Sequence, residues 1–464
     1  MKELSVETLA RIISPKDSLR RAEPTKSTGL ISGLSTDSRT IKTGQCFFAI
    51  AGDNYNGHDY VADAFDKGAV CAVVSNKINI SAPDDKILIK VDDTVQALGS
   101  LAREYRRQNN FKVIAITGSA GKTTTRHIIH HILSQRYKVF QAPENFNNNI
   151  GVPLTLLGAE PEDEIIVAEL GSSQTGEIAY LSQIAQPDIA TITNVQLAHL
   201  NGFGSLENII EEKSSVAQGL ANDGTLIING DNEKLVGYCR AKKLDFLTFG
   251  RSDKCRFRAH NIVDSGLNSS FTISGAEISL PLAGSGNIDN ALAAWAICSR
   301  FGIEIGDFAR ISKTLPAVPM RAEVLQIGTL TVISDCYNAN PASMKNALDM
   351  LANISSVKKG RAVFICGDMA ELAEQSSHLH KELGTLIAAA RVELLLTAGD
   401  LAAVAGHSAA KAAHNDLHVE SFENTNSVCN NLAKLVKDYD IVLVKGSRKV
   451  ALERIIEKLK ALFR

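Results

Sequence analysis

The chain has 464 residues, of which 45% are hydrophobic and 22% charged, a composition typical of a folded protein with about two to four domains. Its 49 Lys and Arg residues nearly balance its 51 Asp and Glu residues, and the net charge of −2 argues against a nucleic-acid partner. No apolar run approaches the roughly 18 residues that a membrane span needs, so we expect no membrane insertion.

The start of the chain and its cysteines favour a cytoplasmic protein. The charged first residues continue as an amphipathic helix with Leu9, Ile12 and Ile13 on one face, which is unlike a secretory signal. The 8 cysteines are scattered and none forms a Cys-x-x-Cys pair, so we expect no zinc site. We predict reduced thiols inside the hydrophobic core.

Turns and apolar segments divide the chain into three sections, with predicted boundaries 1–108, 109–315 and 316–464. The first section has predicted strands at 46–50, 69–74 and 86–91, and its last helix ends in a polar linker. The second has strands at 113–117, 165–170 and 189–195. The third has strands at 330–333, 362–366, 394–397 and 441–444.

Continuous apolar strands that alternate with helices predict an α/β protein with mostly parallel sheets covered on both faces. In such sheets, ligands bind beyond the carboxyl ends of the strands. Several predicted strands of the third section end in a turn that contains Gly or Asp, such as Gly367-Asp368, Gly399-Asp400 and Lys445-Gly446. We therefore expect chemistry at these turns.

The strongest local pattern is a glycine-containing loop between a predicted strand and a predicted helix. It consists of Gly118, Ser119, Ala120, Gly121, Lys122, Thr123 and Thr124. In this context backbone N–H groups and the start of the helix surround phosphate oxygens, the lysine adds a cation, and the threonine hydroxyl faces Mg²⁺. The loop is two residues shorter than the usual phosphate loop, because Ile116 stands where that pattern has its first Gly. The pattern predicts a nucleoside triphosphate site.

Three polar residues follow later strands of the second section. Glu169 ends an otherwise apolar strand, where a carboxylate needs a partner such as a metal or, alternatively, a salt bridge at a sheet edge. His199 lies in a loop, where a histidine is more often a surface residue. Lys213, beside Glu211 and Glu212, is predicted in isolation to be a solvated charge.

Two further clusters lie downstream. Asn287 and Asn290 share one face at the start of a predicted helix, and their spacing alone favours helix capping. The segment 335–341 follows a strand and places polar and aromatic groups in one loop, which is typical of a site.

The order of these motifs resembles that of the Mur ligases of peptidoglycan synthesis. The resemblance covers nearly the whole chain, and its motifs lie at 35–39, 44–49, 57–59, 117–124, 145–153, 168–171, 193–194, 198–199, 203–206, 337–341, 367–372 and 445–448. The Asn-Ala-Asn-Pro motif at 338–341 together with Gly-Asp-Met-x-Glu-Leu at 367–372 is similar to the branch that adds D-alanyl-D-alanine to UDP-N-acetylmuramoyl-tripeptide. The family implies a small α/β N-terminal domain for the UDP-substrate, a central P-loop ATPase and a Rossmann-like C-terminal domain.

The resemblance also implies residue roles. It implies that the uridine nucleotide is bound by Ser35, Thr36, Asp37, Ser38 and Arg39, and that further substrate contacts come from Asn147, Asn148, Asn338, Asn340 and Lys445. ATP would be bound by the loop 118–124, with Asn287 or Asn290 on adenine, Arg321 on the γ-phosphate and Asp335 on the ribose. Mg²⁺ ligands would be Thr123, Glu169, His199 and a carbamylated Lys213. The catalytic set would be Lys122, Glu169, His199, Lys213 and Arg321.

The implied reaction is ATP-dependent amide-bond formation by a monomer with ATP and Mg²⁺. ATP first converts a carboxylate to an acyl phosphate, and the amine of the dipeptide then displaces phosphate. The chain departs from the family pattern at Gln196, Ser215, Gly286 and Met320. Two alternatives stay open: a sibling ligase, such as a folylpolyglutamate synthase or the enzyme that adds the third peptide residue, and a nucleotide-binding regulatory protein without turnover. The motif at 338–341 argues against the siblings, and the retained Lys122 and Arg321 argue against the regulator.

Overall fold

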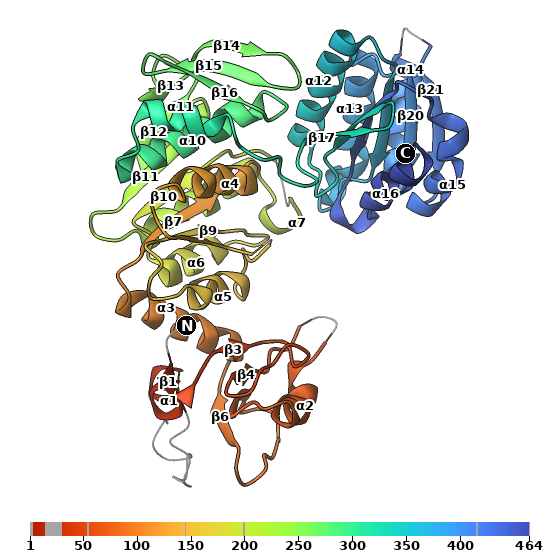
Figure 1. Ribbon diagram of the computed structural model, residues 1–464. Coiled ribbons are helices and arrows are strands. Elements are labelled where there is room, and N and C mark those ends of the chain that lie inside the picture. The colour runs from red at the N-terminus through yellow and green to blue at the C-terminus, as the bar shows by residue number, and fades with distance from the viewer. Residues whose placement is uncertain are drawn as a thin grey trace.

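The computed structural model describes residues 3–13, 30–52, 55–143, 145–197, 200–413 and 416–463, which form three lobes (Figure 1). The predicted fold class is confirmed: each lobe is α/β and is built on a sheet whose strands are mostly parallel. The boundaries 1–108, 109–315 and 316–464 stay a prediction. In the described part of the chain no helix is both long and apolar enough to cross a membrane.

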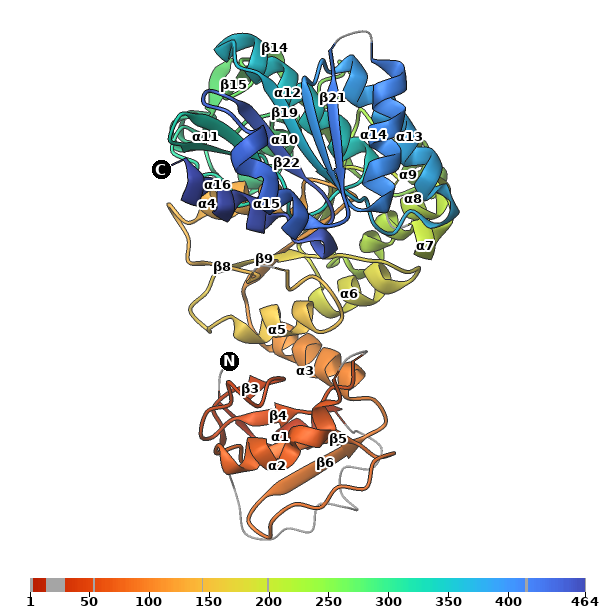
Figure 2. The ribbon, with the colours of Figure 1, turned by 90° about the vertical axis from the view of Figure 1, so that its right-hand side faces the viewer.

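The N-terminal lobe has a four-stranded parallel sheet in the order β3 (Leu34–Ser35), β4 (Cys46–Phe48), β5 (Cys71–Ser75) and β6 (Ile87–Val91). A small antiparallel pair, β1 (Leu4–Ser5) and β2 (Leu30–Ile31), lies beside it. Its helices are α1 (Val6–Ile13) and α2 (Val61–Asp66). Helix α3 (Thr94–Gln108) lies at the junction with the middle lobe (Figure 2), capped by the Asp93 carboxylate.

The middle lobe has a seven-stranded parallel sheet. Its order is β13 (Phe257–Arg258), β12 (Leu247–Gly250), β11 (Thr225–Asn229), β10 (Ile189–Ile192), β7 (Lys112–Thr117), β9 (Ile165–Glu169) and β8 (Val139–Gln141). Its helices are α4 (Lys122–Leu133), α5 (Gly151–Gly158), α6 (Glu177–Ala185), α7 (Leu200–Phe203), α8 (Leu206–Ser214), α9 (Glu233–Ala241), α10 (Gly286–Cys298) and α11 (Ile305–Ser312). Strands β7, β9 and β10 are almost wholly buried, as expected for a parallel sheet covered on both faces.

The middle lobe also carries an antiparallel sheet that the apolar runs of the sequence did not reveal. It consists of β14 (His260–Asp264), β15 (Ser269–Ile273) and β16 (Ala276–Leu280). Strands β15 and β16 are joined by Ser274 and Gly275, both with positive φ, which is a favoured two-residue hairpin turn. The alternation of apolar and polar residues in Phe271-Thr272-Ile273, followed by Ser-Gly, is the sequence signal that could have found it.

The C-terminal lobe has a six-stranded sheet in which only the edge strand β17 (Glu323–Ile327) is antiparallel. The other strands, in sheet order, are β18 (Leu330–Ser334), β22 (Ile441–Lys445), β19 (Ala362–Gly367), β20 (Leu394–Ala398) and β21 (His418–Phe422). Its helices are α12 (Pro341–Lys358), α13 (Ser376–Ala389), α14 (Asp400–Ala412), α15 (Thr425–Leu435) and α16 (Glu453–Leu462).

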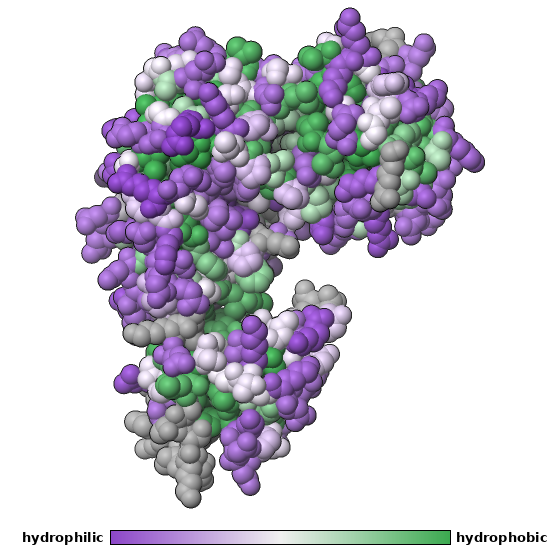
Figure 3. All heavy atoms as spheres, viewed as in Figure 1, coloured by the Kyte–Doolittle hydropathy of each residue, from purple (hydrophilic) through white to green (hydrophobic). Residues whose placement is uncertain are grey.

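The cysteine prediction is confirmed: all 8 thiols are free, and every one except the half-buried Cys429 is buried. Figure 3 shows the N-terminal lobe standing apart from the C-terminal lobe, while the middle and C-terminal lobes lie against each other. The carboxyl ends of β7 and β18 both face this second junction, since the residues that follow them line one cavity there.

Candidate active site

A cavity of about 540 Å³ lies between the middle and C-terminal lobes. Most of the residues predicted to bind nucleotide or substrate line it: Ser119, Ala120, Gly121, Lys122, Thr123, Thr124, Asn147, Asn148, Glu169, Asn287, Asn290, Arg321, Asp335, Asn338, Asn340 and Lys445. These residues come from strand ends, loops and the first turns of helices up to about three hundred positions apart in sequence. They meet because parallel strands deliver the segments that follow them to the same edge of a sheet.

The glycine-containing loop connects β7 to α4, as predicted. Gly121 has φ 84° and precedes the first residue of the helix, and a Cβ there would lie 2.3 Å from Asn290 Oδ1, so only glycine fits. Lys122 Nζ donates to the Gly118 carbonyl oxygen at 2.7 Å. Desolvation lowers the pKa of Lys122, and the nearby Glu169 carboxylate opposes that shift. An anion that replaced the Gly118 carbonyl oxygen as the partner of Lys122 would be attracted strongly, because the ammonium group is desolvated.

The Thr123 hydroxyl, at the start of α4, contacts both Glu169 at the end of β9 and Arg321 of the C-terminal lobe. It lies 3.2 Å from Glu169 Oε2, to which it donates, and 3.3 Å from the Arg321 guanidinium. Glu169 is 2% exposed, and its other oxygen lies 3.1 Å from Arg126 Nε. The alternative of a salt bridge is therefore correct, but its placement at a sheet edge is wrong, because β9 lies between β7 and β8. A buried carboxylate held by these two contacts has a fixed orientation.

Arg321 is held by the C-terminal lobe while its guanidinium reaches the phosphate loop. Its neighbours Met320 and Ala322 both have a left-handed backbone, with φ 58° and 53°. The family pattern has Gly in place of Met320, and the positive φ gives the reason. The guanidinium lies 3.9 Å from the centroid of the Tyr337 ring, and desolvation lowers its pKa.

Asp335 and Lys445 form a buried ion pair at the ends of β18 and β22. Lys445 Nζ lies 2.6 Å from Asp335 Oδ2 and also donates to the Asn338 carbonyl oxygen at 3.1 Å. Asp335 Oδ1 accepts from the backbone N–H of Ala322. Asn340 caps helix α12 through a capping box with Ser343, which fixes the course of the loop 335–340.

The capping prediction for the two asparagines of α10 is wrong, because Ser285 occupies the N-cap position. Asn290 Nδ2 donates to Asn287 Oδ1 at 2.9 Å, and Asn287 Nδ2 donates to the Ala283 carbonyl oxygen at 2.7 Å. Both amides line the cavity beside the phosphate loop. Their shared face thus forms part of the cavity wall.

Three family models match consecutive parts of the chain. They describe the catalytic domain of the Mur ligase family at residues 30–106, the Mur ligase middle domain at 116–298 and the Mur ligase glutamate ligase domain at 320–448. The UDP-N-acetylmuramoyl-tripeptide–D-alanyl-D-alanine ligase of Bacillus subtilis is 35% identical over 443 residues, which span 94% of this chain and 95% of that protein. The chain belongs to the Mur ligase family. The resemblance inferred from the sequence is confirmed.

Other members with the same fold and length support this membership. The ligase of the same description from Escherichia coli is 32% identical over 93% of this chain. A crystal structure of MurF from Acinetobacter baumannii superposes with a TM-score of 0.85 at 29% identity, covering 94% of this chain and 95% of that one. MurF ligase from Thermotoga maritima in complex with ADP has a TM-score of 0.80 at 26% identity, with 93% and 97% covered.

The Mur ligase chain buries Lys213 rather than exposing it, so the prediction of a solvated charge is wrong. The residue is 2% exposed, and its Nζ donates to Ser172 Oγ at 2.7 Å beside the cavity. Burial, together with the charge of Lys122, lowers the pKa of Lys213 to about 7. The neighbouring Glu212 is also buried, because its carboxylate accepts from the N–H groups of Gly176 and Ile178 at the start of α6.

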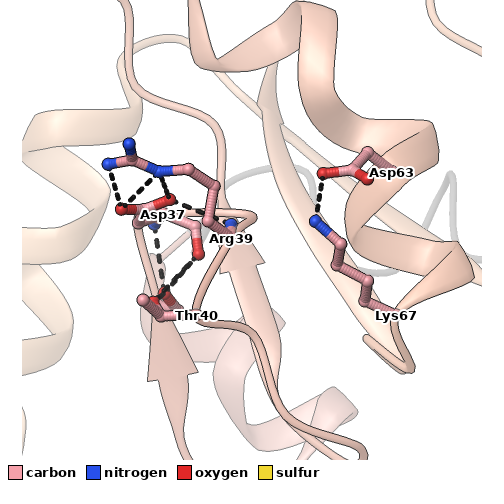
Figure 4. A network of polar contacts seen from close by, with 6 residues as sticks. Asp37, Arg39, Thr40, Asp63 and Lys67 are labelled. Atoms are coloured by element: carbon pink, nitrogen blue, oxygen red, sulfur yellow. Dashed lines mark hydrogen bonds and ion pairs between the residues drawn. The ribbon is translucent and has the colours of Figure 1, made fainter.

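The predicted uridine residues do not line this cavity, and they lie in the N-terminal lobe. There the exposed Arg39 forms an ion pair with Asp37 at 2.7 Å, while the nearby Lys67 pairs with Asp63 (Figure 4). The Arg39 guanidinium lowers the pKa of the Asp37 carboxyl. Of the segment 35–39, Ser38 is buried and the others are half-buried or exposed.

One predicted ligand and two unpredicted residues complete the description. His199 lies outside the described residues. Arg126 and Tyr337 were not predicted as site residues, although both contact predicted ones. Arg126 lies one helical turn after Lys122, so its spacing on the same helix face is the signal that could have found it. Tyr337 was visible only as part of the loop 335–341.

Proposed function

We propose that this protein is an ATP-dependent ligase that joins D-alanyl-D-alanine to UDP-N-acetylmuramoyl-tripeptide in peptidoglycan synthesis. The products are UDP-N-acetylmuramoyl-pentapeptide, ADP and phosphate. The observation that carries the proposal is the single cavity in which the phosphate loop of the middle lobe faces the loop 335–340 of the C-terminal lobe. Curated relatives with this activity in their names match the chain along 91% to 94% of its length.

ATP occupies this cavity with its phosphates on the loop 118–124. In this arrangement Lys122 and Arg321 approach the γ-phosphate from the two lobes, and both are desolvated, which strengthens their attraction to an anion. Asn287 or Asn290 binds adenine, and Asp335 binds the ribose. Thr123 hydrogen-bonds to Glu169 at the metal side of the phosphates.

The residues present fit a Mg²⁺ ion. Glu169 and Thr123 offer a carboxylate and a hydroxyl oxygen beside the phosphate loop, the hard donors that Mg²⁺ shares with substrate phosphates. His199 is the further ligand that we propose. The bound ion would neutralise charge on the transferred phosphate.

Lys213 is the site of carbamylation in this proposal. With a pKa of about 7, half of its amines are neutral at neutral pH, and a neutral amine attacks CO₂ to form an N–C bond and release one proton. The product is a carboxylate on the Lys213 nitrogen, close to Ser172 and the cavity. Its charge would then face the metal side of the site.

The reaction starts when the carboxylate of the tripeptide attacks the γ-phosphorus and ADP leaves. The amine of D-alanyl-D-alanine attacks the resulting acyl phosphate, loses a proton, and expels phosphate from a tetrahedral intermediate. Positions for both peptides come from Asn147 and Asn148 of the middle lobe and from Asn338, Asn340 and Lys445 of the C-terminal lobe. Closure of the lobes would keep water from the acyl phosphate.

The three sections carry different substrates in this proposal. Residues 1–108 bind the UDP end through Ser35, Thr36, Asp37, Ser38 and Arg39, residues 109–315 bind ATP, and residues 316–464 bring the dipeptide. The protein would act as a cytoplasmic monomer.

The test measures phosphate release with purified protein, ATP, UDP-N-acetylmuramoyl-tripeptide and D-alanyl-D-alanine. We expect release only when all three substrates are present. Release that does not depend on the dipeptide, or no release with the full mixture, would contradict the proposed ligase.

A further inference from the structure

Tyr337 follows β18 and lies half-buried at the wall of the cavity, and two guanidinium groups lie over its ring. Of the two arginines that lie over this ring, Arg321 is the closer. The Arg321 Cζ atom lies 3.9 Å from the ring centroid, well inside the roughly 6 Å within which an arginine is attracted to the negative face of an aromatic ring.

A second cation approaches the same ring from the loop after β22. Arg448 Cζ lies 5.9 Å from the Tyr337 centroid, and one of its nitrogens contacts Met320 Sδ at 3.5 Å. Arg448 also forms an ion pair with Glu453, and about half of its side chain is exposed. Two guanidinium groups thus lie over the ring of Tyr337. That of Arg321 is the closer and the less exposed of the two.

The loop that carries Tyr337 also fixes the backbone on both sides of Arg321. Tyr337 N–H donates to the Met320 carbonyl oxygen at 3.3 Å, and Asp335 accepts from the N–H of Ala322 at 3.1 Å. The backbone of Arg321 therefore moves with this loop. Its guanidinium would keep several rotamers open without the ring, and a flexible side chain gives up more entropy when it binds.

The guanidinium of Arg321 links the position of this ring to the nucleotide site. Its Nη2 lies 3.3 Å from the Thr123 hydroxyl, on the other lobe and in the phosphate loop. The guanidinium is thus positioned between an aromatic ring of one lobe and a hydroxyl in the phosphate loop of the other.

We infer that Tyr337 is a positioning residue whose ring holds Arg321 against the terminal phosphate, so that the site favours a nucleoside triphosphate over a diphosphate. The inference rests on the proposed function, and it deepens the role of Arg321 in that function. It predicts that the ring acts through Arg321 alone and makes no separate contribution to binding of the nucleoside.

The experiment measures equilibrium binding of AMP-PNP and of ADP, both with Mg²⁺, to the full chain. Tyr337→Leu should weaken AMP-PNP binding by about tenfold, as loss of a partly desolvated cation–π contact implies, and change ADP binding by less than about twofold. Tyr337→Phe should restore AMP-PNP affinity. Tyr439→Leu, which removes an exposed tyrosine of the same lobe, should leave both affinities unchanged.

A double-mutant cycle separates the ring from other effects. In an Arg321→Met background, Tyr337→Leu should have no further effect on AMP-PNP binding. An equal loss of ADP and AMP-PNP affinity, failure of Tyr337→Phe to restore binding, or an undiminished effect in the Arg321→Met background would each overturn the inference.

A series of fluorinated rings keeps the test valid even if Tyr337→Leu does not fold. Replacing Tyr337 with phenylalanine that carries increasing numbers of ring fluorines keeps the shape of the ring and withdraws charge from its face. AMP-PNP affinity should fall stepwise with fluorine number, and a flat response would overturn the inference. If the unsubstituted protein bound neither nucleotide, the proposed function would fail with it. If it bound both but released no phosphate in the ligase assay, only the proposed function would fail.

Discussion

Lys213 shows how far tertiary burial can move the chemistry of one residue. The ordinary pKa of a lysine is 10.5, and burial beside Lys122 lowers that of Lys213 to about 7. A buried amine with this pKa is neutral often enough to act as a nucleophile, which a surface lysine beside Glu211 is not. Two predictions follow at the scale of this residue.

The first prediction concerns stability. The unfolded chain keeps the Lys213 proton up to its ordinary pKa of 10.5, while the folded protein releases it near 7, so the unfolded state binds more protons in that window. The free energy of unfolding should therefore rise with pH from about 7 to 10 because of this group, and Lys213→Met should lack that part of the rise. Urea unfolding of the unsubstituted protein and of Lys213→Met, without bicarbonate and at several pH values, measures this free energy. If it changed with pH in the same way for both proteins, the result would contradict the burial of Lys213.

The second prediction concerns the carbamate. Lys213→Ala should abolish ligase turnover, because the carboxylate formed on the amine is lost. A short carboxylic acid added to the assay should restore part of the activity by occupying the space that the substitution leaves. Lys242→Ala, which removes an exposed lysine of the same lobe, serves as the control that needs no rescue. Absence of rescue at any acid concentration would count against the carbamate.

At the scale of elements, the antiparallel sheet of the middle lobe forms a contact with the C-terminal lobe. Gly266, in the turn between β14 and β15, is buried, and a Cβ there would lie 3.1 Å from the Ile354 side chain and 3.3 Å from Asn353 of α12. Gly275, in the next turn, has a similar positive φ but nothing within 4 Å. The two glycines therefore differ in their contact with the other lobe and not in backbone strain.

This difference gives a matched pair of variants. Gly266→Lys should force the hairpin away from α12 and raise the KM for ATP, because the cavity between the lobes widens. Gly275→Lys carries similar left-handed strain, on the order of 1 kcal/mol, but should leave the KM unchanged. Kinetics and small-angle X-ray scattering of both variants measure the effect. Equal changes in the two variants would mean that strain, not the contact between lobes, is responsible.

At the scale of the whole molecule, the two proposed substrate sites lie on different lobes, and this separation is testable. Lys122→Ala should abolish turnover and weaken AMP-PNP binding by at least about tenfold, since it removes a cation at the phosphates, while UDP-substrate binding stays within about twofold. Arg39→Glu, on the surface of the N-terminal lobe, should weaken binding of the UDP-substrate and leave AMP-PNP binding within about twofold. Isothermal titration of each variant with each ligand measures it, and a variant that lost both affinities would contradict the assignment of substrates to lobes.

The sequence by itself determined much of this protein. The strand segments, the phosphate loop and the family followed from it, because apolar runs of strand length, Gly-Lys-Thr before a helix and continuous motifs such as 338–341 are local signals. The predicted strands at 113–117, 165–170 and 441–444 correspond to β7, β9 and β22, with one end of each shifted by one residue.

Only the tertiary structure decided which of these local signals meet. Burial of Lys213, the position of Asn287 and Asn290 on the cavity wall, and the partners of Glu169 depend on the packing of neighbouring elements, which no spacing along the chain encodes. The contacts of Arg126 with Glu169 and of Tyr337 with Arg321 likewise became visible only in the folded chain. Short sequence motifs identify the chemical groups of the site. Burial of charges and contacts between the lobes arise only when parallel strands bring distant loops to the same edge of a sheet.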